Sequence, residues 1–521
     1  MKKILLMLVA LVATVTISAK DGEEMEGWQK SFTPVANADD LAGIHTAVAG
    51  DGSVYASTTY NQTFSFANKP VTDPEGLLSS CVVKYDKDGN EKWSVTFVGK
   101  CQIHALTADA DGTLYLAGQT QDIQVVCTDA SMKHYEINNP TSDPWGDGSV
   151  QIDAYSAFIA KIGADGLVQV IKTISPVANA EMQSSGLYYP LEGDIYLRPN
   201  KISLYGEKVY VAANYQGDVP EIKWSGSFLN VFDFMYMDNK CAGVFSLNKN
   251  DLGTPDNEAY VCNSEPVSYS QYYPEAIDFV VQDNKVYMAF IGFGNLTVEN
   301  NTTSKAFEFA TTDDESGNKE HGLVLVPLAE LSKAVKFGAA MHDKDAIPYK
   351  LTGATIANSN CIMAGTFYGN FPLDNSVTKE VNSSFVASIK MSDCSVNWTT
   401  VSPVEAEASC MVVAGEEIKA STNAATYTIK TATGEVDTEQ TMAQSFDDAD
   451  CYNNQYVSTI FTQETSVVVF SPKLKPSGIN EAQAQKNGAV KYYNLNGIEL
   501  TAPQHGLNIV KTADGTRKVL K

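Results

Sequence analysis

A unit of about 60 residues recurs along this chain, and each copy contains two short predicted β-hairpins. The clearest copies cover residues 44–99 and 103–176. In both copies, alternating apolar residues lead into Asp-Gly turns, for example at Asp51 and Asp111. Asp-Gly is a preferred pair for tight hairpin turns. One such unit cannot bury its apolar face alone, so the copies must pack against one another.

Seven copies can be recognised, because further inner hairpins begin near residues 202, 276, 352, 409 and 446. Four-stranded sheets repeated around an axis are typical of β-propellers. We therefore predict an all-β protein in which residues 20–472 form a seven-bladed β-propeller.

The seventh copy ends at Pro472, one outer strand short of a complete blade. Residues 26–36 match the outermost strand of other copies, with Trp28 standing where Trp93 and Trp398 stand. We predict that this N-terminal strand completes the seventh blade and closes the ring, which removes an exposed sheet edge. The three tryptophans are then packing residues.

The two ends of the chain differ from this body. Residues 1–19 combine Lys2 and Lys3 with an apolar run and end in small residues at Ala19, which predicts a secretory signal peptide. No later run is long and apolar enough to predict a transmembrane segment. Residues 473–521 carry eight Lys or Arg against three Asp or Glu, and their Asn-Gly, His-Gly and Asp-Gly pairs predict a small β unit after a linker.

The net charge of −25 makes nucleic acid an unlikely class of partner, because an acidic surface repels phosphate backbones. The simplest interpretation of this charge is that it keeps an exported protein soluble.

The repeats resemble the SBBP-type β-propeller repeat and the quinoprotein-like repeat of exported bacterial proteins. The resemblance rests on the GDG, DADG and DKDGNEKW turns, on the FIAKI and FVASI strands, and on three Gly-Asp or Gly-Asn pairs that begin at Gly217, Gly294 and Gly369. It covers residues 26–472. It implies the fold more than an activity, since such propellers host both binding and catalysis.

The C-terminal residues resemble the sorting domain of the type IX secretion pathway of Gram-negative bacteria, through the YNLNG and GLNIVK segments and a basic final strand. This resemblance implies contact with the secretion machinery and export to the outer-membrane surface or the extracellular space. The alternatives are a small β cap without a sorting role and a periplasmic protein.

Three sets of residues could carry chemistry. Residues 86–91 and 109–112 resemble the start of a calcium loop, but both lie where a hairpin must turn, so we expect no metal site. His45 and His104 occupy the same place in the first two copies, and we favour a structural role because no nucleophile motif accompanies them. We expect no cofactor and assign no catalytic residue.

Nine cysteines without a CxxC motif predict mostly buried thiols and no zinc site. One pair stands apart: Cys241 and Cys262 are predicted to lie on neighbouring antiparallel strands, where a disulfide is possible.

Long insertions gather at one end of the predicted blades, whereas the turns at the other end are short. The insertions are residues 59–79, 119–155, 214–240, 291–320 and 366–383, with the linking segments 177–199 and 264–275. They hold six aromatic residues that we predict to include ligand-binding rings: Trp145, Trp224, Tyr188, Tyr189, Tyr272 and Tyr273. Exposed aromatics beside carboxylates suit a glycan or a peptide. The alternative is that the insertions pack together and bury these rings.

These observations predict an exported binding or scaffold protein of the cell envelope. The alternative is a propeller enzyme, a hydrolase or lyase, that acts on glycans or peptides at the same end.

Overall fold

The computed structural model places 38 strands and one short 3-10 helix, η4 (Leu331–Lys333), in the part of the chain that it describes. That part comprises residues 27–34, 44–60, 63–66, 69–72, 79–140, 154–177, 195–226, 241–263, 275–310, 319–342, 348–374, 376–442, 446, 448–452, 455–462, 466–472, 491–493, 499–500, 507–512 and 515–520. The chain divides into two compact units, Met1–Pro472 and Lys473–Lys521.

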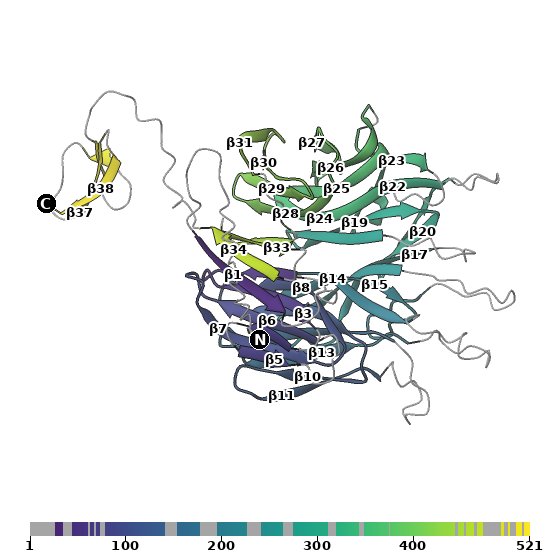
Figure 1. Cartoon of the computed structure of the whole chain (residues 1–521). Coiled ribbons are helices and arrows are strands. Elements are labelled where there is room, and N and C mark those ends of the chain that lie inside the picture. The colour runs from purple at the N-terminus through teal and green to yellow at the C-terminus, as the bar shows by residue number, and fades with distance from the viewer. Residues whose placement is uncertain are drawn as a thin grey trace, which may run out of the picture. The chain divides into compact units, whose positions relative to one another are not determined.

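The first unit consists of antiparallel sheets, each built on four strands that follow one another from one side of the sheet to the other (Figure 1). We number these sheets one to seven in chain order. Sheet one contains β2 (Ile44–Val48), β3 (Val54–Tyr60), β6 (Ser79–Tyr85) and β7 (Glu91–Val98). Sheet two contains β8 (Cys101–Ala108), β9 (Leu114–Thr120), β12 (Ser156–Ile162) and β13 (Val168–Ile174). Sheet three contains β14 (Tyr196–Tyr205), β15 (Lys208–Gln216), β16 (Cys241–Asn248) and β17 (Asp256–Asn263). Sheet four contains β18 (Glu275–Gln282), β19 (Lys285–Phe293), β22 (Lys319–Pro327) and β23 (Val335–His342). Sheet five contains β24 (Tyr349–Ala357), β25 (Asn360–Asn370), β26 (Thr378–Lys390) and β27 (Val396–Val401). Sheet six contains β28 (Ala408–Ala414), β29 (Glu417–Thr422), β30 (Thr426–Lys430) and β31 (Val436–Met442). Sheet seven contains β32 (Asp448–Tyr452), β33 (Gln455–Thr462) and β34 (Ser466–Pro472), followed by the N-terminal strand β1 (Gly27–Pro34).

The first strands of the seven sheets lie next to one another. Each of β2, β8, β14, β18, β24, β28 and β32 contacts the next in this order, and β32 also contacts β2. The all-β, propeller-like architecture predicted from the repeats is therefore present. We call the end where strand two leads into strand three, and where one sheet leads into the next, the loop end. The opposite end, with its short hairpin turns, is the turn end.

β1 pairs with β34, so the N-terminal strand lies beside the last strand of the first unit (Figure 1). The register runs from Gly27 opposite Pro472 to Phe32 opposite Val467. This register places Trp28 opposite Ser471, near the end of the third strand of sheet seven. In sheet one, Trp93 lies opposite Lys84, at the same position of the third strand.

The tryptophans of sheets one and five join neighbouring sheets, as the packing role predicted. The indole of Trp93 donates to the carbonyl oxygen of Ala164, 2.9 Å away, in the turn of sheet two. That of Trp398 donates to the carbonyl oxygen of Thr431, 3.1 Å away, in the turn of sheet six. Both rings lie on a turn glycine, Gly166 or Gly434, where a Cβ atom would come within 2.8 Å of the ring.

The FIAKI and FVASI strands also have a packing explanation. Phe158 lies opposite Gly118, and Phe385 lies opposite Gly365. A Cβ on Gly118 would lie 2.4 Å from the carbonyl oxygen of Gln102 and 2.6 Å from the Phe158 ring. Each phenylalanine thus packs on a glycine. Because glycine has no side chain, the two strands and the ring can approach closely there.

Three of the long insertions contain hairpins that extend the sheet before them. The hairpin β10 (Gln124–Thr128) and β11 (His134–Asn138) from sheet two pairs with β7 of sheet one. The hairpin β20 (Asn295–Glu299) and β21 (Ser304–Glu308) from sheet four pairs with β17 of sheet three. The hairpin β4 (Thr63–Phe66) and β5 (Lys69–Thr72) from sheet one pairs with β1. These parts of the insertions cover outer sheet edges, which the sequence did not predict.

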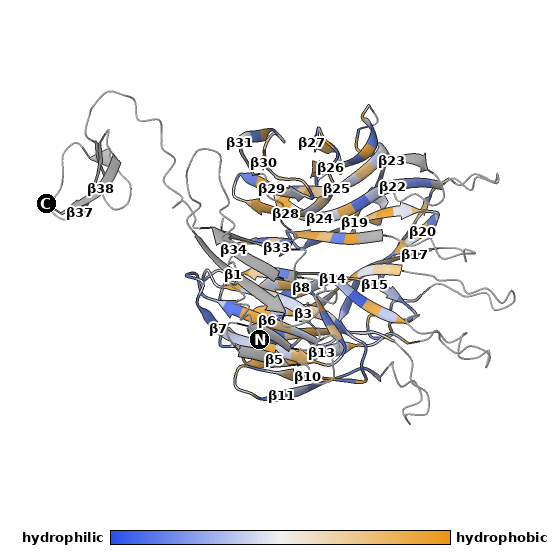
Figure 2. Ribbon diagram, in the orientation of Figure 1, coloured by the Kyte–Doolittle hydropathy of each residue, from blue (hydrophilic) through white to orange (hydrophobic). Residues whose placement is uncertain are grey.

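Hydrophobic and hydrophilic residues alternate along many strands, as Figure 2 shows. The apolar side chains pack between adjacent sheets, for example Phe97 of sheet one against Phe158 of sheet two, with ring centroids 5.5 Å apart. In the described residues, no helix has the length and apolar character needed to cross a membrane.

The second unit contains one four-stranded antiparallel sheet in its described part. Its strands are β35 (Lys491–Tyr493), β36 (Glu499–Leu500), β37 (Leu507–Thr512) and β38 (Gly515–Leu520), in the order β36-β35-β37-β38.

Candidate functional site

Five of the seven first strands carry a β-bulge or a similar shift of register close to the loop end. In four of them the extra residue is polar, namely His104 in β8, Asn200 in β14, Thr352 in β24 and Ser409 in β28. A bulge redirects a side chain, and bulges are common beside functional sites. The loop end of the innermost strands is therefore the candidate site.

His45 and His104 are near each other, but they are not equivalent in register as the sequence predicted. His45 is paired opposite Ser57, whereas His104 is the extra residue of the bulge in β8. Burial, together with the positive charge of Arg198 and the nearby His45, lowers the pKa of His104 to about 3. Burial also lowers the pKa of His45, although Asp448 opposes this effect. Both imidazoles are therefore neutral near pH 7.

Arg198 on β14 is the only arginine in residues 1–472 of this acidic chain. Its side chain is exposed, and within the described residues it forms no ion pair or hydrogen bond. Its charge lowers the pKa of both His45 and His104, so it lies within electrostatic range of both rings. The sequence analysis missed this residue, although its isolation in an acidic body was a visible signal.

Carboxylate side chains join neighbouring first strands to one another. Asp448 Oδ2 accepts from the backbone N–H of Thr46 at 2.7 Å and from its hydroxyl at 3.0 Å. Asp450 Oδ2 accepts from the Val48 N–H at 2.8 Å, which joins sheet seven to sheet one. Between sheets three and four, Lys201 of β14 pairs with Asp278 of β18 at 2.5 Å. These acidic groups thus have structural partners, in contrast to Arg198.

The buried Asp450 should make the free energy of unfolding depend on pH. Burial raises its pKa to about 7 in the folded protein, against about 4 in an unfolded chain. The neutral form is favoured on folding, so this group stabilises the fold below about pH 4, and that stability is lost as the pH rises through 7. Asp450→Asn should therefore become more stable relative to the wild type by about 2–4 kcal/mol between pH 4.5 and pH 8.

The measurement is chemical unfolding of both proteins at several pH values. His45 and His104 titrate in both proteins, so the difference isolates Asp450. A difference in unfolding free energy that does not change with pH would show that Asp450 ionises normally.

Two of the cavities in the described part of the chain lie between sheets. One of about 310 Å³ lies between sheets five and six and has an almost entirely apolar lining, with Phe385, Val401 and Tyr427 in its walls and Ser402 and Thr422 toward the loop end. The other, of about 590 Å³, lies between sheets four and five at the turn end and is lined by turn residues that include Asp283, Glu330 and Asp393. The turn end, for which the sequence predicted short turns, therefore also carries a cavity.

Trp224, one of the six aromatic residues predicted to include ligand-binding rings, is buried, which is the alternative that the sequence analysis left open. Its side chain is only 2% exposed and packs against Tyr215, with ring centroids 4.9 Å apart, and against Phe245 at 5.6 Å. Its indole N–H donates to Asn257 Oδ1 at 2.9 Å. Burial of this ring fixes the first part of an insertion onto sheet three. The other five predicted rings, Trp145, Tyr188, Tyr189, Tyr272 and Tyr273, lie outside the described residues.

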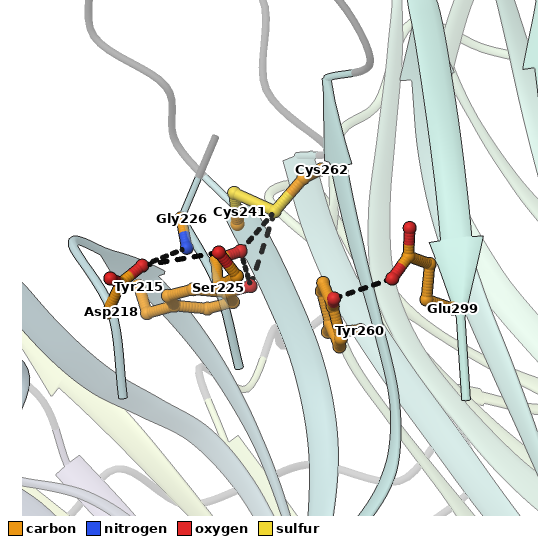
Figure 3. The surroundings of a disulfide bond; sticks show 8 residues. All are labelled: Tyr215, Asp218, Ser225, Gly226, Cys241, Tyr260, Cys262 and Glu299. Atoms are coloured by element: carbon orange, nitrogen blue, oxygen red, sulfur yellow. Dashed lines mark hydrogen bonds between the residues drawn. A yellow bond between two sulfur atoms is a disulfide. The ribbon is translucent and has the colours of Figure 1, made fainter. Parts of the chain in front are cut away.

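The predicted pairing of Cys241 and Cys262 is confirmed, and the two form a disulfide (Figure 3). Their Cα atoms are 4.6 Å apart, on β16 and β17 at the loop end of sheet three. The hydroxyl of Tyr215 lies 3.2 Å from Cys262 Sγ and 3.1 Å from the carbonyl oxygen of Ser225. The disulfide thus fixes this end of sheet three. Cys81, Cys127, Cys361 and Cys394 are buried, in agreement with the prediction for most thiols.

The two calcium-like stretches act as turns. Asp86 Oδ1 accepts from the backbone N–H groups of Asp88 and Asn90 at 3.0 and 2.9 Å. Asp109 forms an ion pair with Lys249 of sheet three. Their carboxylates therefore stabilise turns and sheet contacts.

No family model matches this chain, and no curated protein matches its sequence. Solved structures that align with it include BamB from Moraxella catarrhalis, with 10% identity, 85% of this chain and 98% of that chain covered, and a TM-score of 0.33. Sqt1 from Saccharomyces cerevisiae has 8% identity, covers 82% and 96%, and has a TM-score of 0.35. YCF48 bound to a D1 peptide has 7% identity, covers 88% and 99%, and has a TM-score of 0.37. Similarities at this level establish neither a shared family nor a shared function.

The residues of the candidate site come from sheets one, two, three and seven, so the site forms only when distant segments of the sequence meet. The bulge at His104 has a signal in the sequence. Tyr55 follows Ile44 by eleven residues in the first copy, whereas Tyr115 follows Ile103 by twelve residues in the second, so the second copy contains one extra residue.

Proposed function

We propose that this protein is an exported, seven-bladed β-propeller, closed by its N-terminal strand, that binds a glycan or peptide ligand at the loop end of its axis. The observation that carries the proposal is the convergence of His45, His104 and Arg198 from three different sheets at that end. Convergent polar groups on a rigid all-β scaffold are typical of a binding site. The role is binding or scaffolding at a bacterial envelope.

Export is supported by the signal-like residues 1–19 and by the disulfide between Cys241 and Cys262, since such bonds persist in oxidising compartments. The C-terminal unit would direct the protein to the outer-membrane surface through the type IX machinery.

A second candidate function, a hydrolase or lyase, is favoured by one observation. Asp450 has a pKa near 7, as a general acid requires at neutral pH. Binding is the better supported role because Asp450 and Asp448 are engaged by the backbone of β2.

Binding of the mature protein, residues 20–521, to glycan and peptide arrays tests the proposal. Thr352→Trp and Asn200→Trp place a large ring at the axial bulges and should each abolish binding. Asp393→Trp places the same ring at the turn end and should leave binding unchanged. Loss of binding only in Asp393→Trp, or no binding to either array by the wild type, would contradict the proposal. Turnover of a bound ligand that Asp450→Asn abolishes would establish the enzyme instead.

A further inference from the structure

Arg198 is an unusual residue for its surroundings. The chain carries a net charge of −25, yet one exposed guanidinium without an ion partner stands among the first strands at the loop end. The nearby Lys201 is paired with Asp278, so within the described residues of this cluster Arg198 is the cation left without a carboxylate.

His104 provides a second, independent observation. Its Nε2 atom is buried and, among the described residues, has no hydrogen-bond partner. A buried polar atom without a partner is unfavourable, and in native proteins it commonly marks a missing water, ion or ligand. The strand of Arg198, β14, lies against both β8, which carries His104, and β9, and the charge of Arg198 acts on the His104 ring.

The geometry points to a site for a carboxylate group of the ligand, held by the Arg198 guanidinium and completed by His104 at the loop end of the axis. This inference rests on the proposed function and specifies the chemistry of its ligand. A guanidinium presents a planar fork that binds both oxygens of a carboxylate. Before a ligand binds, both histidines are neutral, and the Arg198 guanidinium supplies the positive charge that attracts an anion.

Proton uptake accompanies binding in this arrangement. The groups that face His104 are His45 from β2, Arg198 from β14 and Gln119 from β9. An anion placed between the ring and the guanidinium offsets the charge that disfavours imidazolium. His104 then takes a proton from solvent at Nε2 and donates it to the anion in a hydrogen bond.

Histidine NMR of the full mature protein tests the site, with acetate as the probe and chloride replaced at constant ionic strength. Near pH 5.5, acetate should shift the imidazole resonances of His45 and His104 in a saturable way, and the shift should be smaller at pH 8. His45→Gln and His104→Gln assign the two signals. Arg198→Gln should remove the response, and Arg198→Lys should weaken the apparent affinity at least fivefold, because lysine keeps the charge but lacks the fork.

Lys133→Gln is the matched control. It removes an exposed positive charge from the turn just before β11, away from the first strands. It should leave the acetate response unchanged. Equal thermal midpoints of the Arg198 variants and the wild type establish that they fold. Equal shifts in acetate and chloride, a response that survives in Arg198→Gln, or a response to phosphate stronger than to acetate would each overturn the inference. No response to either anion would mean that water alone fills the position, which also overturns it.

Array binding separates this inference from the proposed function. One outcome is that acetate causes no shift of the histidine resonances while Arg198→Gln binds its array ligand like the wild type. In that case the binding role at the loop end stands and the carboxylate site is wrong.

Discussion

Deleting residues 20–35 should abolish the cooperative thermal transition of the first unit and cause the protein to aggregate. The deletion removes β1, which pairs with β34 on one side and with β4 on the other. Two strands then expose unpaired backbone groups, and exposed edges of apolar strands promote association between chains. Differential scanning calorimetry and sedimentation measure both effects.

Deleting residues 473–521 is the control, because they form a separate compact unit. This truncation should leave the transition of the first unit in place. A deletion of residues 20–35 that melts like the wild type and remains monomeric would show that β1 contributes nothing to the fold.

Trp224→Ala should lower the free energy of unfolding by about 3–5 kcal/mol, because it removes a large buried ring and leaves a cavity. The ring contacts Tyr215 and Phe245 and fills the space above Gly243, where a Cβ would lie 2.6 Å from it. Urea unfolding measures the effect. Val404→Ala, at an apolar residue that is 53% exposed, should change stability by less than about 0.5 kcal/mol.

This substitution also separates the two interpretations of Trp224. If the folded Trp224→Ala protein loses ligand binding without losing stability, the ring is a binding group and not a packing residue.

The sequence predicted the parts of the fold that depend on local pattern. Asp-Gly turns and alternating residues identified the hairpins, and the register of β1 follows the match between Trp28 and Trp93. The Cys241–Cys262 pair was predictable for the same reason, since a short hairpin brings both residues opposite each other.

The candidate site was harder to predict because it depends on contacts between distant sheets. His104 faces Arg198 only after sheets two and three pack together, and Asp450 reaches Val48 across about 400 residues of chain. Aromatic content alone was misleading for Trp224, because a tryptophan in an insertion can cover a sheet as readily as a ligand. The hairpins of the insertions were missed because their partner strands belong to the preceding sheet.

The proposed binding site requires a central axis, and such an axis exists only if the seven sheets form one closed ring through β1. Disulfide cross-linking tests this directly. Gln29 lies opposite Phe470, and Lys30 lies opposite Val469. Neighbouring antiparallel pairs alternate between wide and close spacing, so one of the double-cysteine variants places its Cα atoms at a distance that suits a disulfide.

Non-reducing peptide mapping by mass spectrometry should find an intramolecular 29–470 or 30–469 bridge in monomeric protein. A Lys30→Cys and Ser466→Cys variant, which is out of register, should give none. Absence of both in-register bridges, or bridges found only between two chains, would contradict the closed ring.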